Sequence, residues 1–118
     1  MARILVVDDA QFMRMRISRL LMAEGHQILE ADDGSNAIAV YKSSRPDIVL
    51  MDVTMPKMDG LSALRHIREY DPQAKVVMLT ALGLESVVLE AVKAGAKDFI
   101  VKPFELPRVL STINKLML

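Results

Sequence analysis

Four short apolar runs in the sequence are each followed by a residue that can bind phosphate or metal. Asp8 and Asp9 follow the run ILVV, Asp52 follows IVLM, Thr80 follows VVML, and Lys102 follows FIV. Short runs rich in valine and isoleucine, alternating with segments of helical periodicity, are typical of buried parallel strands. The carboxyl ends of parallel strands share one edge of a sheet, and ligands bind at that edge. We therefore expect these five residues to lie close together.

The alternation of strands and helices predicts the fold class. Five βα units are too few for an eight-stranded barrel, so an open α/β sheet with helices on both faces is expected. Right-handed crossovers favour the strand order 2-1-3-4-5, with the first and third strands at the switch point. We predict one doubly wound, flavodoxin-like (βα)5 domain over residues 1–118. Its strands are expected at 3–7, 27–31, 47–51, 75–79 and 97–101, and its helices at 11–24, about ten residues from 34, 60–70, 85–94 and 105–116.

Helical spacing and turn residues add detail to this prediction. On the first helix we expect Phe12, Ile17, Leu20 and Leu21 to form one buried stripe. Asp32, Asp33, Asp59 and Asp71 adjoin glycine, proline or one another, and we interpret them as turn or cap residues and not as metal ligands. The candidate metal-binding aspartates are therefore those that follow the strands.

Composition excludes several classes of protein. Fifteen basic and fifteen acidic residues cancel, so no overall field would attract nucleic acid or an anionic membrane. Cysteine is absent, which excludes disulfides, thiolate catalysis and cysteine-ligated metal. The N-terminal segment is too short and too polar for a signal peptide or membrane span. We expect a cytoplasmic protein without direct nucleic-acid or membrane partners.

Three of the strand-end residues are carboxylates, and together they predict a metal site. Asp8, Asp9 and Asp52 would repel one another without a cation. Oxygen ligands without histidine or cysteine favour Mg²⁺, with Mn²⁺ as an alternative. A carboxylate beside such a metal can attack phosphorus, and Asp52 is the best candidate nucleophile. Lys102 and Thr80 would stabilise the charge on the phosphoryl oxygens.

Longer motifs around the same residues resemble a known family. The pair DD after the first strand, VLMDVTMPKMDG, LTA and GAKDFIVKPF are similar to the landmarks of response-regulator receiver domains over the full chain. Within that family the sequence looks most like the stand-alone CheY-type chemotaxis regulators. The order 2-1-3-4-5 is already known for CheY and for flavodoxin.

The resemblance implies a role for each residue of the metal site. Asp52 would be the phosphoacceptor. Asp9 would bind Mg²⁺ directly and Asp8 through water, and the backbone carbonyl of Thr54 would be a further ligand. Thr54 and Leu82 occupy positions that vary in the family and tune dephosphorylation.

The resemblance also implies a switch. Thr80 would be the switch hydroxyl and Phe99 the switch aromatic, while Lys102, before a commonly cis bond to Pro103, would bind phosphate. Many receivers have tyrosine at the position of Phe99, and phenylalanine cannot make the hydroxyl contact. From the residues alone, simple core packing is an equal alternative for Phe99.

The implied function is a signalling switch and not a turnover enzyme. It would take phosphate from a histidine kinase, phosphorylate and dephosphorylate itself intrinsically, and bind an effector such as a flagellar motor switch protein. Alternatives are a receiver from a DNA-binding regulator, a phosphorelay intermediate, a haloacid-dehalogenase-type phosphatase or an FMN binder. The phosphatase would need D-x-D after its first strand, where this chain has adjacent aspartates. An FMN binder would not place two aspartates in its phosphate loop.

Overall fold

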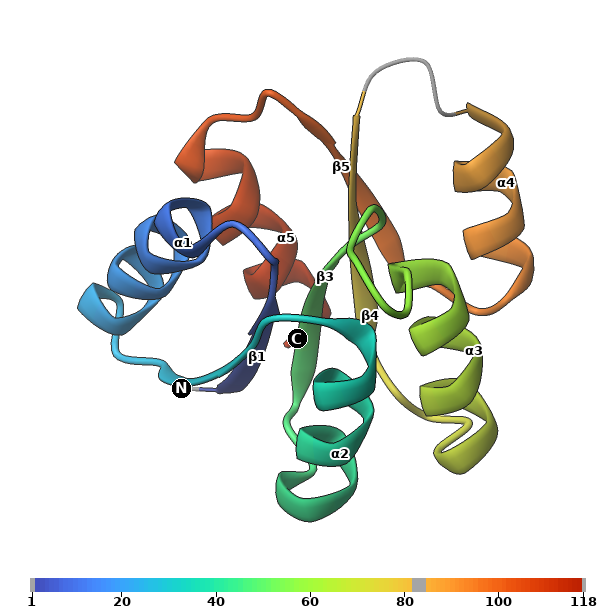
Figure 1. The fold of residues 1–118 in the computed structure, drawn as a ribbon. Coiled ribbons are helices and arrows are strands. Elements are labelled where there is room, and N and C mark those ends of the chain that lie inside the picture. Colours follow the sequence, from blue (N-terminus) through green and yellow to red (C-terminus); the bar gives the residue numbers. More distant parts are fainter. Residues whose placement is uncertain (1, 82–84, 118) are drawn as a thin grey trace.

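The computed structural model of the chain describes residues 2–81 and 85–117. Within these ranges, five strands alternate with five helices (Figure 1). The strands are β1 (Arg3–Val7), β2 (Gln27–Ala31), β3 (Ile48–Asp52), β4 (Val76–Ala81) and β5 (Asp98–Lys102). The helices are α1 (Gln11–Ala23), α2 (Gly34–Ser44), α3 (Gly60–Tyr70), α4 (Glu85–Lys93) and α5 (Leu106–Leu116). No helix in the described ranges combines the length and apolar character needed to cross a membrane.

The five strands form one parallel sheet in the order β2-β1-β3-β4-β5. The predicted doubly wound fold and its strand order are therefore confirmed. The switch point lies between β1 and β3. The strand that follows β1 in the sequence, β2, is added on one side of β1, whereas β4 and β5, which follow β3, are added on the opposite side of the sheet. Ligands of such sheets bind in the crevice at this switch point.

Helices cover both faces of the sheet and create two hydrophobic cores (Figure 1). Leu5 and Val49 belong to the core against α2, α3 and α4. Ile4 and Leu50 belong to the core against α1 and α5. Because successive side chains of a strand point to opposite faces, neighbouring residues fill different cores. The central strand β3 is buried along its whole length, as its continuous apolar run predicts.

Aspartates outside the strand ends have local structural roles. Asp33 caps α2 by accepting a hydrogen bond from the backbone N–H of Asn36 at 2.8 Å. Asp59 caps α3 in the same way. Asp71 accepts the backbone N–H of Gln73 in the following turn. These contacts confirm the interpretation of Asp33, Asp59 and Asp71 as cap or turn residues.

The predicted stripe on α1 is wrong in one position. Ile17 and Leu21 are fully buried, but Phe12 is 73% exposed. A helix has 3.6 residues per turn, so a step of five residues from Phe12 to Ile17 places the two side chains about 140° apart. The guanidinium of Arg16 instead lies 5.8 Å from the centre of the Phe12 ring.

Three polar residues that were expected to follow the strands belong to the strands themselves. Asp52 pairs with Leu79, Thr80 with Val101, and Lys102 with Ala81. The strands thus run one or two residues further than expected, because these residues continue the hydrogen-bonded ladder. The backbone of Asp52, Thr80 and Lys102 is consequently fixed by the neighbouring strand.

Candidate phosphate and metal site

Three carboxylates meet at the carboxyl end of the sheet beside the switch point. Oxygen atoms of Asp8, Asp9 and Asp52 all lie within 4.8 Å of one another. Asp8 and Asp52 are buried, whereas Asp9 is exposed. The predicted convergence of these three side chains is confirmed.

Lys102 reaches into this cluster from the opposite half of the sheet. Its Nζ lies 3.2 Å from Asp52 Oδ1 and 3.4 Å from Asp8 Oδ2. The positions of Asp8, Asp52 and Lys102 continue the alternate series of residues that faces α1 and α5, and so their side chains approach from one side of the sheet. Sequence motifs predicted a phosphate-binding role for Lys102, but they did not indicate that the ammonium would also pair with these two carboxylates.

The electrostatics of the cluster favour the binding of a cation. Burial raises the pKa of Asp52 above its ordinary value, the Lys102 ammonium opposes that rise, and the carboxylates of Asp8 and Asp9 add to it. Burial works against a charged Lys102, but the carboxylates of Asp52 and Asp8 outweigh it and raise the pKa of the ammonium. Lys102 therefore remains positive, and one positive charge stands against three acidic groups.

The donor set suits Mg²⁺ or Mn²⁺, which prefer carboxylate oxygen ligands. Asp8 already uses both oxygens, because Oδ1 accepts the backbone N–H of Ala10 at 2.9 Å and Oδ2 contacts Lys102. Within the described ranges, the Asp9 carboxylate has no hydrogen-bond or ion-pair partner. Asp9 is thus the side chain best placed to bind a cation directly, and Asp8 is better suited to act through water.

Among the described residues, the side chains of Thr54, Thr80 and Phe99 form no hydrogen bond with the carboxylate cluster. Thr80 is buried at the end of β4, and its hydroxyl donates a long hydrogen bond of 3.4 Å to the carbonyl of Ala81. Phe99 is 36% exposed on β5, which contradicts the alternative that it is a simple core residue. Thr54 is exposed in the loop after β3, and its role as a metal ligand stays a prediction. Leu82 lies outside the described residues.

Sequence reasoning missed two residues that shape the site. A Cβ atom on Gly60 would lie 2.0 Å from the backbone oxygen of Asp52, so only glycine fits there. The dipeptide Asp59–Gly60 was a signal for a helix start, but not for this close approach. Arg14 contacts the backbone carbonyl of Asp8 at 2.7 Å, and no motif indicates that contact.

A doubly wound sheet with clustered carboxylates and a lysine at its switch point is the arrangement of an α/β domain suited to bind a metal ion and a phosphoryl group. The sequence profile of the response regulator receiver domain matches residues 4–114. The chain therefore belongs to the response regulator receiver family and is a phosphate-accepting signalling domain.

Two kinds of relative are similar to the chain. The chemotaxis protein CheY of Bacillus subtilis is 53% identical over 114 residues, covering 96% of this chain and 95% of that protein. CheY in the CheX–CheY–BeF3–Mg²⁺ complex of Borrelia burgdorferi is 39% identical with a TM-score of 0.92, covering 98% of this chain and 89% of that one. NtrX of Brucella abortus is 33% identical with a TM-score of 0.92, but this chain covers only 26% of it.

Proposed function

We propose that this receiver accepts a phosphoryl group from a histidine kinase on Asp52 and acts in a cytoplasmic chemotaxis pathway. The contact between Lys102 and both Asp52 and Asp8 is the observation that carries the assignment to Asp52, because it sets a phosphate-binding cation against the candidate nucleophile. The similarity to CheY proteins over nearly their whole length supports the pathway. In this proposal the domain is a switch with intrinsic phosphorylation and dephosphorylation, and not a turnover enzyme.

The side chain of Asp52 is arranged for nucleophilic attack. Oδ1 is occupied by Lys102, whereas Oδ2 accepts no hydrogen bond from the described residues, and 11% of the side chain remains exposed. In the proposed transfer, a carboxylate oxygen of Asp52 forms a bond to phosphorus as the bond from phosphorus to the donor imidazole nitrogen breaks. The imidazole leaves with its electron pair and takes up a proton.

Lys102 and Thr80 would act on the transferred phosphoryl group. The Lys102 ammonium exchanges part of its contact with Asp52 for a phosphoryl oxygen, and the Thr80 hydroxyl donates to another. When bound by Asp9, Asp8 and Asp52, Mg²⁺ would supply positive charge that lowers the repulsion between carboxylate and phosphate. Phosphorylation adds about −1.5 to −2 charge units at this edge of the sheet, enough to draw Thr80 inward.

The surface around α4 and β5 is the proposed docking site for an effector, such as a flagellar motor switch protein. Leu89 and Val92 are 56% and 52% exposed on α4, and Phe99 is exposed on β5. Exposed apolar side chains of this kind often mark an interaction surface. Leu89→Asp should weaken effector binding while leaving the thermal midpoint nearly unchanged.

A receiver belonging to a larger regulator is the second candidate. The similarity to NtrX, of which this chain covers about a quarter, favours that alternative. In such a regulator Asp52 would accept phosphate in the same way, and only the process controlled by the phosphorylated receiver would differ. A gene deletion that abolishes chemotaxis without changing transcription would support the chemotaxis function.

Mapping the phosphorylated residue tests the proposal. The protein is incubated with Mg²⁺ and acetyl phosphate, and the site of the added phosphoryl group is located by mass spectrometry. Asp52→Asn should remove the modification. Asp47→Asn is the matched control, because Asp47 immediately precedes the same strand and its carboxylate oxygen accepts the backbone N–H of Arg3. Labelling of the Asp52→Asn protein at the wild-type level would overturn the assignment.

A further inference from the structure

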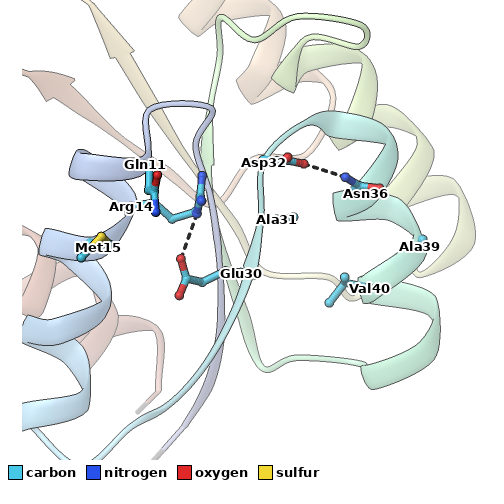
Figure 2. Close-up of a pocket in the computed structure, with 9 residues that line it drawn as sticks. All are labelled: Gln11, Arg14, Met15, Glu30, Ala31, Asp32, Asn36, Ala39 and Val40. Carbon is cyan, nitrogen blue, oxygen red and sulfur yellow. Dashed lines mark hydrogen bonds and ion pairs between the residues drawn. The ribbon is translucent and has the colours of Figure 1, made fainter.

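A groove of about 540 Å³ opens between α1 and α2, along the edge strand β2 (Figure 2). Arg14 projects into it from α1 and meets Glu30 of β2. The Arg14 Nε donates to Glu30 Oε1 at 2.8 Å. The receiver function described above gives this ion pair no role.

The same arginine also contacts the acidic cluster. Its Nη1 donates a hydrogen bond of 2.7 Å to the backbone carbonyl of Asp8. The side chain is only 16% exposed, whereas that of Glu30 is 43% exposed. A guanidinium presents several N–H groups in a rigid plane, so it can hold two acceptors at once in fixed directions.

Both backbone groups of Asp8 are thereby linked to β2. The Asp8 N–H donates directly to the carbonyl of Ala31 at 3.2 Å. The Asp8 carbonyl is linked through Arg14 to Glu30, the residue next to Ala31. These contacts fix the orientation of the peptide group that joins Asp8 to Asp9.

No side-chain cap stabilises the start of α1. The residue at the N-cap position is Ala10, which has no oxygen to offer to the first N–H groups of the helix. The carboxylate of Asp9 has no partner among the described residues either. The Asp9 carboxylate is therefore positioned by the two peptide groups that flank it, of which Arg14 holds the carbonyl of the first and Asp8 Oδ1 holds the N–H of the second.

We propose that Arg14, oriented by Glu30, is a positioning residue that places the Asp9 carboxylate for binding Mg²⁺. This inference rests on the proposed metal site. Positioning by Arg14 and the charge of Arg14 have opposite effects on Mg²⁺ affinity. A positive charge near a cation site disfavours the cation, so charge alone predicts that removing Arg14 tightens Mg²⁺ binding, whereas positioning predicts that it weakens binding.

Isothermal titration calorimetry with Mg²⁺ alone tests the sign, because the chain has no tryptophan to report binding by fluorescence. Arg14→Met should weaken Mg²⁺ binding by about tenfold, the lower end of the cost expected when a residue supporting a ligand is lost. Arg14→Lys keeps the charge but loses the planar fork, and it should also weaken binding. Glu30→Gln keeps an oxygen that accepts the Nε proton, and it should bind Mg²⁺ within about twofold of wild type.

Arg16→Met is the matched control. Arg16 lies on the same helix and stacks on Phe12, and it makes no contact with Asp8 in the described structure. Its removal changes the net charge by the same amount as Arg14→Met, and Mg²⁺ affinity should be unchanged or slightly higher. Thermal midpoints measured in the absence of Mg²⁺ verify that each variant is folded.

The outcomes separate this inference from the proposed function. If wild-type protein binds no Mg²⁺, the proposed metal site itself is wrong. If wild type binds Mg²⁺ and Arg14→Met or Arg14→Lys binds it as tightly or more tightly, Arg14 is not a positioning residue. Should Arg14→Met fail to fold, Arg14→Lys alone decides, because it preserves charge and most of the side-chain volume.

Discussion

Lys102 and Asp52 form an ion pair of 3.2 Å across two strands that are not neighbours in the sheet, since β4 lies between β3 and β5. The long lysine side chain spans that separation and also reaches Asp8. The site therefore contains a built-in cation before any metal or phosphoryl group arrives. Lys102 thus compensates the carboxylates, and in the proposed function it would afterwards bind the phosphoryl group.

Lys102→Met should shorten the lifetime of the phosphorylated protein without lowering Mg²⁺ affinity. The substitution removes the charge that stabilises the phosphoryl oxygens, but it also removes a cation that competes with the metal. The measurements are the decay of phosphorylated Asp52 and a calorimetric Mg²⁺ titration. Lys97→Met, at an exposed position just before β5, is the control. Equal losses in both measurements would place Lys102 among the groups that build the metal site.

Asp52→Asn should raise the stability of the metal-free protein by about 1 kcal/mol. Two unit charges about 4 Å apart interact by roughly 1 to 4 kcal/mol at the effective dielectric of a partly solvated site, and Lys102 offsets part of the repulsion. Asparagine relieves the repulsion and keeps the shape. Thermal unfolding with and without Mg²⁺ measures the gain, and the wild-type stabilisation by Mg²⁺ should largely disappear in the variant.

The contribution of Asp52 to the stability of the metal-free wild-type protein should increase as the pH falls. Burial and the neighbouring carboxylates raise the pKa of Asp52 in the folded protein above its unfolded value. The folded state therefore binds this proton more tightly, and its contribution to stability grows as the pH falls through the raised pKa toward the unfolded value near 4. Asp52→Asn should lack this contribution. A difference between the two proteins that does not change with pH would contradict the raised pKa.

Gly60→Ala should cost about 2 kcal/mol or more and should impair phosphorylation. The added Cβ would lie 2.0 Å from the Asp52 backbone oxygen, and backbone cannot move aside as a flexible side chain can. Gly25→Ala is a useful comparison, since Gly25 has a φ of +90° but no atom within 4 Å of an added Cβ. That variant should pay only for backbone strain, about 1 kcal/mol. Chemical denaturation compares the two, and similar losses would argue against the clash.

Tyr41→Phe should reduce stability by about 1 kcal/mol at neutral pH and by less in acid. The buried Tyr41 hydroxyl donates to Asp71 Oδ2 at 2.7 Å and is the largest cause of the lowered pKa of Asp71. A lowered folded-state pKa gives stability that is present above the unfolded pKa and is lost as the pH falls through the folded one. Unfolding of both proteins at several pH values measures this. A constant difference between them would mean that the hydrogen bond does not depend on ionised Asp71.

The fold and the strand order could be predicted from the sequence, because buried strands have a recognisable pattern of apolar residues. β3 is buried on both faces and reads as a continuous apolar run, and Asp52, Thr80 and Lys102 lie at or one residue before the ends of β3, β4 and β5. Parallel pairing then brings Asp8 and Asp52 together without any knowledge of side-chain conformations. The weaker periodicity of α1 led to the error at Phe12, because hydrophobicity alone does not say which apolar residue faces solvent.

Contacts that depend on side-chain reach could not be predicted. Arg14 meets the Asp8 carbonyl six positions earlier and Glu30 sixteen positions later, spacings that belong to no helical or strand repeat. The closeness of Gly60 to Asp52 depends on how the loop after β3 returns over the sheet. Both features follow from tertiary geometry, which short-range patterns do not encode.

The 94 positions that separate Asp8 from Lys102 also have a consequence for biosynthesis. A ribosome makes the three aspartates well before it makes the lysine that compensates them. A nascent chain that lacks β5 carries the acidic groups without their counter-charge and without the lysine that would hold a phosphoryl group. On the proposed function, a nascent chain would therefore complete its phosphate-accepting site only when β5 joins the sheet.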